Sequence, residues 1–286
     1  MKNKTFTVVG IGELLWDVLP NGKELGGAPA NFCYHASYFG ANSFLISAVG
    51  DDLYGNEIIS ILKKRNTNYA INIVKYPTGI VSVKLKKGIP TYKIHENVAW
   101  DFIQLKNEAI PALKNADAIC YGTLSQRSKT SLKTVQKAIS LVPKTALKVF
   151  DINLRASYYT KEIIEDTLKC SNVLKLNDEE LIVLTKMFDL KEDQEESCKQ
   201  LLNRFGLKLV ALTNGSKGSI LFTENEISKC SVPKIKVIDT IGAGDSFTAA
   251  LIMGILNKKT LKETHETAVK HAAKICSGKG ATPVIT

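Results

Sequence analysis

The chain has 286 residues, of which 44% are hydrophobic and 23% are charged. This composition is typical of a globular protein and excludes a largely disordered chain, which would be poor in hydrophobic residues. The length excludes a small disulfide scaffold, because a chain of this size can bury a large apolar core. The formal net charge of +10 leaves three kinds of partner to consider: a nucleic acid, a membrane surface or a small anionic ligand.

The N-terminal segment and the cysteines indicate the cellular compartment. No apolar run reaches the roughly 18 residues of a membrane-spanning helix. The run Phe6–Ile11 is too short for a secretory signal and is soon followed by Glu13, so we predict a strand there. The six cysteines include no closely spaced pair that would indicate a zinc site. Scattered thiols fit a reducing compartment, and we expect a cytoplasmic protein that binds no membrane.

Short apolar runs alternate with longer amphipathic stretches along the chain. The predicted strands are Phe6–Ile11, Phe44–Val49, Ile80–Leu85, Ala118–Tyr121, Lys148–Ile152, Val173–Leu176, Leu209–Thr213 and Ser219–Phe222. The clearest predicted helices are Pro29–Phe39, Asp52–Arg65, Ser128–Leu141, Lys161–Lys169 and Asp178–Met187. Several strands are continuously hydrophobic, as in a parallel sheet with helices on both faces. The pattern predicts a single α/β domain over residues 1–286, with a doubly wound, mostly parallel sheet.

Two segments interrupt this alternation. Residues 13–27 contain Pro20 and Asn21-Gly22 and have no helical period. Residues 76–100 contain the alternating apolar run that starts at Ile80, followed by a Lys86-Lys87-Gly88 turn and a second short run. The second pattern predicts a β-hairpin with a glycine turn. We expect these two segments, approximately 13–27 and 76–100, to form a small β lid on the main domain.

A glycine-rich string, Asp239-Thr240-Ile241-Gly242-Ala243-Gly244-Asp245, precedes the apolar segment Ser246–Leu256. Its glycines allow a tight turn at a helix N-terminus, where free N–H groups and the helix dipole favour an anion. Asp245 would then accept a proton from a hydroxyl while the amides of residues 242–244 hold a phosphoryl group. The alternative is a glycine turn in which Asp245 caps the helix. The string is not a Walker A loop, since GxxxxGK[ST] does not occur.

This string resembles the C-terminal signature of the ribokinase-like (PfkB) sugar kinases. Gly26-Gly27-Ala28-Pro29-Ala30-Asn31 is similar to the N-terminal signature of that family, and Gly12-Glu13-Leu14-Leu15-Trp16-Asp17 resembles the first strand end of fructokinases. The resemblance implies that Gly26 and Gly27 let a sugar approach the backbone and that Asn31 and Asp17 bind its hydroxyls. From the residues alone, these segments also fit a loop before a helix and, for Asp17, a solvated acid.

Two further strings follow in the order of the family. Asp151-Ile152-Asn153-Leu154-Arg155 ends a predicted strand, and the resemblance implies that Asn153 and Arg155 lie near the substrate. The alternative is a local Asp151–Arg155 ion pair. Asn177-Asp178-Glu179-Glu180 resembles the N-x-x-E motif, which implies that Asn177 lies near the phosphates and that Glu180 holds Mg²⁺ through water. Asn177 also fits a helix cap, and both roles are compatible.

The segments that the resemblance places around the nucleotide come later in the chain. Thr213-Asn214-Gly215-Ser216-Lys217-Gly218-Ser219 resembles the family segment T-x-G-x-x-G, so Thr213, Gly215, Lys217 and Gly218 are expected near the phosphates and ribose. Asn214-Gly215 is also typical of a hairpin turn. The resemblance places residues 271–280 near the adenine. Trp100 lies in a segment similar to the A-W-D of fructokinases, which implies packing on the sugar; the alternative is a core tryptophan.

Together these resemblances imply an ATP-dependent sugar kinase that uses Mg²⁺ and phosphorylates a primary hydroxyl, with fructose as the expected sugar. Ribose, 2-keto-3-deoxygluconate and nucleosides are the alternatives within the family. The scarcity of arginine favours a neutral sugar over a phosphorylated one. A nucleic-acid-binding protein is suggested only by the charge, and we expect no nucleic acid. A dehydrogenase would need GxGxxG after the first strand, which is absent. An exposed hairpin edge allows a homodimer through the lid.

The net charge is concentrated in two segments. Residues 75–97 contain five lysines and one glutamate, and residues 258–279 contain six lysines and two glutamates. Each segment therefore carries +4, and the rest of the chain is nearly neutral. One segment is the expected lid and the other is the expected adenine side, so we predict basic zones on both flanks of the nucleotide site.

Overall fold

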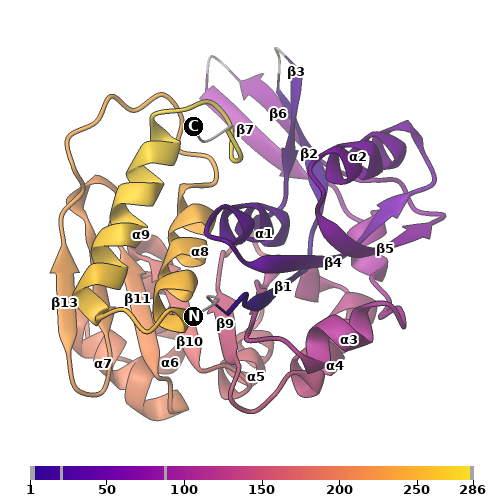
Figure 1. The fold of residues 1–286 in the computed structure, drawn as a ribbon. Helices are drawn as coiled ribbons and strands as arrows, with labels where there is room; N and C mark the ends of the chain where they lie inside the picture. The colour runs from indigo at the N-terminus through magenta and orange to yellow at the C-terminus, as the bar shows by residue number, and fades with distance from the viewer. Residues whose placement is uncertain (1–3, 20–21, 87–88, 284–286) are drawn as a thin grey trace.

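The strands of this chain form two separate sheets (Figure 1). The structure is a computed structural model that describes residues 4–19, 22–86 and 89–283. In this part of the chain, nine strands form the larger sheet and four form the smaller one. Each predicted strand is present within about two residues of its expected bounds. The five predicted helices also agree with the structure to within one residue at each end.

The larger sheet is parallel except at one edge. Seven neighbouring strands pair in parallel, from β11 across the sheet to β5 at one edge, whereas β12 and β13 at the other edge pair antiparallel. Its order is β13 (Ile227–Cys230), β12 (Ser219–Phe222), β11 (Leu209–Thr213), β10 (Val173–Asn177), β9 (Leu147–Asp151), β8 (Ala118–Tyr121), β1 (Thr7–Ile11), β4 (Asn42–Gly50) and β5 (Asn68–Val74). The strand β5 was not predicted, because Asn72 interrupts its apolar run.

Helices cover both faces of this sheet. One face packs against α1 (Ala28–Tyr38), α2 (Leu53–Lys64), α8 (Ala243–Leu256) and α9 (Leu261–Cys276). The other packs against α3 (Ala109–Lys114), α4 (Lys129–Leu141), α5 (Lys161–Lys169), α6 (Asp178–Phe188) and α7 (Gln194–Phe205). Successive residues of β1 enter different cores, since Val8 packs on the first face and Val9 on the second. In Figure 1, α1, α8 and α9 lie in front of the sheet and α6 and α7 behind it. The prediction of a doubly wound sheet is therefore confirmed.

The strand order reverses at β1. The chain leaves β1 for β4 and β5 on one side and returns through β8 on the other side. In open α/β sheets, ligands bind beyond the carboxyl ends of the strands at such a switch point. Strands β9, β10 and β11 end at Asp151, Asn177 and Thr213 respectively. The three motif-bearing segments after these strands are consequently gathered at one edge of the sheet.

The smaller sheet rises from the end of the larger one, at the top of Figure 1. Its order is β3 (Gly22–Gly26), β2 (Leu15–Leu19), β6 (Gly79–Lys86) and β7 (Ile89–Ile94). The predicted hairpin is confirmed by the antiparallel pairing of β6 with β7, although residues 87–88 of its turn lie outside the described residues. Residues 13–27 contribute two paired strands. The end of the second segment, η1 (Ala99–Phe102), belongs instead to the core of the larger sheet.

Across the described ranges 4–19, 22–86 and 89–283, no helix combines the length and the apolar character needed to cross a membrane.

Candidate active site

A cavity of about 870 Å³ lies between the carboxyl edge of the larger sheet, the small sheet and the facing ends of α8 and α9. Most of the predicted site residues line this cavity, although they come from segments far apart in the sequence. Those that line it are Asp17, Gly27, Asn31, Asn153, Arg155, Asn177, Glu180, Thr213, Gly215, Gly218, Gly242, Ala243, Gly244 and Asp245. Three predicted residues, Gly26, Trp100 and Lys217, do not line it.

The N-terminus of α8 opens into the cavity. Gly242 is the N-cap residue and has φ +75°, and a Cβ atom there would lie 2.7 Å from Cα of Ala281. The amide of Ala243 donates to the carbonyl oxygen of Thr240 at 3.2 Å. Within the described residues, the amides of Gly242, Gly244 and Asp245 have no protein acceptor. In this geometry the Ala243 amide is thus already paired, although Ala243 lines the cavity, whereas the Asp245 amide is unpaired.

Asp245 lies in the first turn of α8 and faces Asn31 of α1. Nδ2 of Asn31 donates to Oδ2 of Asp245 at 2.8 Å, whereas no side chain caps α8. The alternative of an Asp245 helix cap is thus wrong. Burial, followed by the negative charge of Asp151, raises the pKa of Asp245 to about 7, against the opposing effects of Asn31 and Lys175. A carboxyl group with a pKa close to neutral pH is well suited to accept a proton from a substrate hydroxyl.

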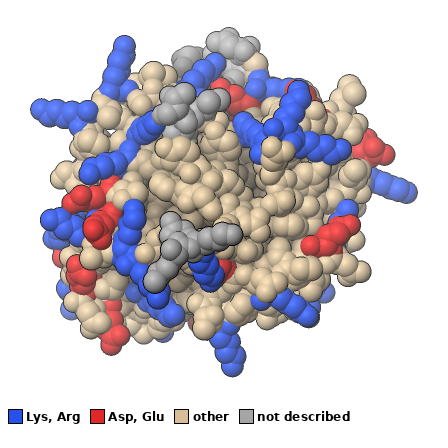
Figure 2. All heavy atoms as spheres, viewed as in Figure 1, with Lys and Arg blue, Asp and Glu red and all other residues tan. Residues whose placement is uncertain are grey.

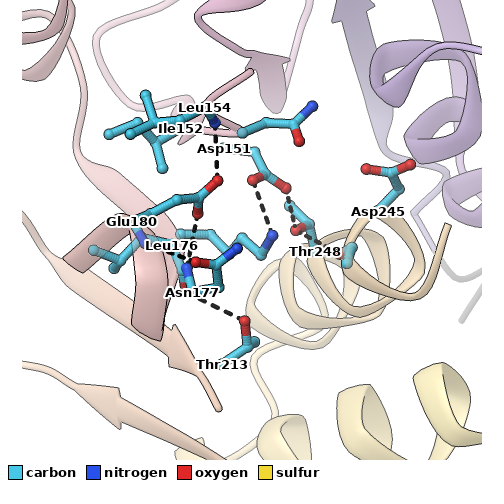
Figure 3. Close-up of polar contacts among 12 residues, drawn as sticks. Asp151, Ile152, Leu154, Leu176, Asn177, Glu180, Thr213, Asp245 and Thr248 are labelled. Carbon is cyan, nitrogen blue, oxygen red and sulfur yellow. Dashed lines mark hydrogen bonds and ion pairs between the residues drawn. The ribbon is translucent and has the colours of Figure 1, made fainter. Parts of the chain in front are cut away.

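Lys175 lines the cavity and forms a buried ion pair with Asp151, which Figure 3 shows together with Thr248. Nζ of Lys175 lies 3.0 Å from Oδ1 of Asp151, and Oγ1 of Thr248 donates to Oδ2 at 2.9 Å. Burial alone would lower the pKa of Lys175, but the charges of Asp151 and Glu180 outweigh it and the net pKa is raised. Lys175 therefore remains a cation, and it is 3.0 Å from the position that a Cβ atom on Gly244 would take.

The sequence pattern did not single out Lys175, because the lysine lies within a hydrophobic strand and its partner is distant along the chain. The alternative of a local Asp151–Arg155 ion pair is wrong, since Asp151 is bound to Lys175 and Thr248. Arg155 is exposed and donates to the carbonyl oxygen of Leu154 at 3.0 Å. Arg155 also belongs to the cavity lining.

Asn177 and Glu180 form a reciprocal cap at the start of α6. Oδ1 of Asn177 accepts from the amide of Glu180, and Oε2 of Glu180 accepts from the amide of Asn177, both at 2.8 Å. Oε1 of Glu180 also accepts from the amide of Leu154 at 2.9 Å, as Figure 3 shows. The capping interpretation of Asn177 is confirmed. Each oxygen of Glu180 has one backbone donor, so each retains a lone pair for a water molecule.

The small sheet contributes acidic groups to the opposite end of the cavity. Asp17 on β2 faces Glu24 on β3 as its cross-strand partner. Burial, and then the charge of Glu24, raise the pKa of Asp17 to about 6. A Cβ atom on Gly26 would lie 2.3 Å from Oδ2 of Asp17. Gly26 therefore makes room for this carboxylate and does not line the cavity, which corrects its predicted role. Gly27, at φ +118°, does line it.

Two other predictions need correction. Trp100 is 1% exposed within η1, where the guanidinium carbon of Arg127 lies 3.9 Å from the centre of its ring. A Cβ atom on Gly79 would lie 2.3 Å from its Nε1 atom. The indole is thus a core residue behind the small sheet and cannot pack on a ligand in the cavity. Lys217 ends the exposed η3 turn (Gly215–Lys217) between β11 and β12 and is not among the residues that line the cavity.

The end of the cavity beside α9 is more apolar. Residues of the loop before α8 and of the last turns of α9 line it: Val232, Ile235, Val237, Ala272, Ala273 and Cys276. His271 does not line the cavity, because its Nε2 atom lies 3.1 Å from Nδ1 of buried His35. Among the described residues, no group of three or more His, Cys, Asp or Glu side chains forms a direct metal site.

The basic segments are only partly placed beside the cavity. The α9 helix begins at Leu261 and lines the cavity with its second half, from Val269 to Cys276. The lysines at 258, 259 and 262 therefore lie at the far end of the helix, and the prediction is wrong for this half of the segment. Figure 2 shows basic side chains along the upper edge of the molecule and also over the rest of this face. The side chains of the lysines at 84, 86 and 87 lie outside those that the structure describes.

Comparisons with known proteins agree with this architecture. The family model for the pfkB family carbohydrate kinases matches residues 14–286. An uncharacterized sugar kinase of Pyrococcus horikoshii is 32% identical over 273 residues, covering 89% of this chain and 84% of the relative. Its structure in complex with ATP has a TM-score of 0.80 at 29% identity, with 96% and 94% of the two chains covered.

Two fructokinases are also similar. Fructokinase-2 of Zea mays is 28% identical over 310 residues, covering 97% of this chain and 90% of the relative. The crystal structure of Vibrio cholerae O395 fructokinase, bound to fructose, ADP and calcium, has a TM-score of 0.81 at 22% identity. The match covers 97% of this chain and 95% of the Vibrio chain. At this level of identity, the similarity concerns the fold. The family match extends over nearly the whole chain, and the chain therefore belongs to the PfkB family of carbohydrate kinases.

Proposed function

We propose that this carbohydrate kinase transfers the γ-phosphate of ATP to a primary hydroxyl of a small neutral sugar, with fructose as the first candidate. The observation that carries the proposal is the environment of Asp245. Its carboxyl group has a pKa of about 7 and lies at a helix N-terminus with unpaired amides, inside one cavity. That cavity has acidic side chains at one end and an apolar lining at the other.

The chemical step follows from these groups. Asp245 accepts the proton of the sugar hydroxyl, whose oxygen forms a bond to the γ-phosphorus while the bond from that phosphorus to the β–γ bridging oxygen breaks. ADP leaves, and the proton passes from Asp245 to solvent. The amides of Gly242, Gly244 and Asp245, the dipole of α8 and the cation of Lys175 stabilise the negative charge on the transferring group.

Glu180 is the residue that would hold Mg²⁺, through water. Its carboxylate lines the cavity, and both oxygens keep a lone pair beside their backbone donors. This arrangement suits Mg²⁺, which keeps several of its waters and needs few direct protein ligands. When bound, the ion would neutralise the phosphate oxygens of ATP. Asn177 is expected near the phosphates, and Thr213, Gly215 and Gly218 along the nucleotide. The apolar lining beside α9 is expected to hold the adenine.

The opposite end of the cavity supports a neutral sugar. Asp17 and Asn31 supply acceptors and a donor for hydroxyl groups, and Asn153 and Arg155 complete this end. Asp17 and its neighbour Glu24 would repel a phosphate or carboxylate on the sugar, and Arg155 supplies a single compensating charge. The similarity to maize fructokinase-2 supports fructose. Ribose, 2-keto-3-deoxygluconate and nucleosides are the substrates to test against it.

The small sheet is proposed to act as a lid on a single kinase domain. It borders the cavity through Leu15, Asp17, Val81 and Ile94, and its closure would exclude water and limit hydrolysis of ATP. We further propose a cytoplasmic enzyme, which fits thiols that are all free among the described residues. The outer strands β3 and β7 provide edges for a homodimer through the lid.

The test is an assay of ADP release with Mg-ATP and a panel of fructose, ribose, 2-keto-3-deoxygluconate, a nucleoside and fructose 6-phosphate. We expect the highest kcat/KM with fructose and no activity without a sugar. Higher kcat/KM with a phosphorylated or acidic sugar would contradict the neutral-sugar assignment. Absence of sugar-dependent ADP release throughout the panel would contradict the proposed function.

A further inference from the structure

Glu13 presents a buried carboxyl group to the sugar end of the cavity. It lies two residues after the end of β1, is 3% exposed and belongs to the cavity lining. Its Oε2 atom has no hydrogen-bond partner among the described residues. A buried polar atom without a partner is costly, so an unpaired buried oxygen on a residue of the cavity lining points to a contact that the ligand supplies.

The backbone beside Glu13 is held from several sides. The amide of Gly12 donates to the carbonyl oxygen of Ile46 at 3.2 Å, and Oγ of Ser47 donates to the carbonyl oxygen of Gly12 at 2.6 Å. Gly27 packs so closely that a Cβ atom there would lie 2.4 Å from the carbonyl oxygen of Glu13. The carboxyl group therefore starts from a rigid position, as a group that selects a substrate must.

The surrounding charges place Glu13 among the groups already assigned to the site. Burial raises its pKa, while its own backbone amide, the guanidinium of Arg155 and the amide of Ala28 at the start of α1 act in the opposite direction. The charge of Glu13 in turn contributes to the raised pKa of Asp245. Glu13 thus lies within electrostatic reach of both the proposed base and the arginine at the sugar end.

We propose that Glu13 hydrogen-bonds one specific hydroxyl of the sugar and thereby selects sugars that carry a hydroxyl at that position. The proposal rests on the proposed function of the cavity. A site built to bond a hydroxyl rejects an analogue that lacks it, because the polar group of the protein is then left buried and unpaired. The sequence pattern drew attention to Asp17 in the same motif, whereas only the fold shows that Glu13 lines the cavity and has an unpaired oxygen.

The alternative role of Glu13 is purely structural, as an acceptor for the amides at the start of α1, where Gly27 supplies no side-chain cap. Two substitutions separate the roles. Glu13→Gln keeps the shape and a hydrogen-bonding end, whereas Glu13→Met keeps an unbranched chain without one. Glu226→Gln is the matched control, because it removes the same charge from an exposed turn between β12 and β13.

The experiment measures kcat and KM for fructose, for each monodeoxyfructose that retains the phosphorylated hydroxyl, and for ATP, in the wild type and the three variants. For fructose we expect Glu13→Met to lower kcat/KM roughly 10- to 100-fold and Glu13→Gln to lower it less. The KM for ATP should stay within about twofold. For one monodeoxyfructose, the wild type and Glu13→Met should have equal kcat/KM, because the contact is already missing.

A structural role would lower kcat/KM equally for fructose and all its deoxy derivatives, and that result would overturn the proposal. A change confined to the KM for ATP would also overturn it. If Glu13→Met does not fold, the Kd of each of the same sugars is measured by calorimetry for Glu13→Gln and for the wild type. Only one deoxy sugar should then have the same Kd for both proteins. A wild type that phosphorylates fructose but shows no such pattern refutes this inference alone. A wild type that phosphorylates no sugar refutes the proposed function and this inference with it.

Discussion

Replacing Asn31 by alanine removes the hydrogen bond that its Nδ2 atom donates to Oδ2 of Asp245 at 2.8 Å. This donor favours the ionised carboxylate, since it opposes the burial that raises the pKa of Asp245 to about 7. Loss of the donor should therefore raise this pKa further. The ionised form is the base, so the rising limb of the pH profile should move to higher pH in the Asn31→Ala variant.

The size of the shift follows from the strength of the bond. A hydrogen bond to a charged group contributes about 1.5–3 kcal/mol, and one pH unit corresponds to about 1.4 kcal/mol. The full loss would move the pKa by about one to two units. Water that enters the space left by the amide would restore part of the solvation. We therefore expect a shift of about one unit, to a midpoint near pH 8.

The measurement is kcat/KM for the sugar between pH 5 and pH 10, because this ratio reports the groups of the free enzyme. The wild-type rate should rise with a midpoint near pH 7, the pKa of Asp245. Asn31→Ala should also raise the KM for the sugar far more than the KM for ATP. An unchanged limb, or a limb displaced to lower pH, would refute the assignment of Asp245 as the titrating base.

Three other substitutions test the groups around the base. Asp245→Asn should lower kcat roughly 10²- to 10⁴-fold. A kcat close to that of the wild type would show that Asp245 is not the catalytic base. Because burial disfavours its ionised form, the same variant should have a higher Tm than the wild type at pH 8 but not at pH 4. Lys175→Met leaves Asp151 buried without its cation. Denaturant unfolding should therefore show a free energy of unfolding lower by about 3–5 kcal/mol, and a decrease below about 1 kcal/mol would contradict the buried pair. Gly27→Ala should lower the free energy of unfolding by about 1–3 kcal/mol or more through backbone strain, and it should raise the KM for the sugar. Gly40→Ala is the control, because Gly40 also has a positive φ but has open space around it; this variant should leave the KM unchanged.

The elements of the large sheet were predictable because each has a local pattern. Continuous apolar runs of about five residues are typical of buried parallel strands, and the intervening amphipathic stretches are typical of helices. The polar strand β13 and the interrupted strand β5 have weaker patterns and were not predicted. Residues 13–27 contain two strands, β2 and β3, that pair with each other. A turn-rich sequence did not reveal them, because the sheet is completed by the pairing of β2 with β6 of a distant hairpin.

The candidate site was predictable to the extent that its residues follow strands or open helices. The carboxyl ends of parallel strands meet at one edge of the sheet, and this explains why Asn153, Asn177 and Thr213 line one cavity. Trp100 and Lys217 follow similar motifs but lie elsewhere, since a motif specifies the backbone position and not the direction in which a side chain packs. Gly26 shows the same limit, because its role depends on the carboxylate across the strand pair.

The sequence by itself determined the fold class, the glycine turn before α8 and the family to which the motifs belong, because each depends on short patterns of residues that are neighbours in the sequence. Only the tertiary structure decided how the chemical groups act on one another. Asn31 and Asp245 are 214 residues apart, and Asp151 pairs with a lysine 24 residues away. The raised pKa of Asp245 and the unpaired oxygen of Glu13 arise from burial and from neighbours contributed by other elements. These are properties of a packed environment, which local sequence does not specify.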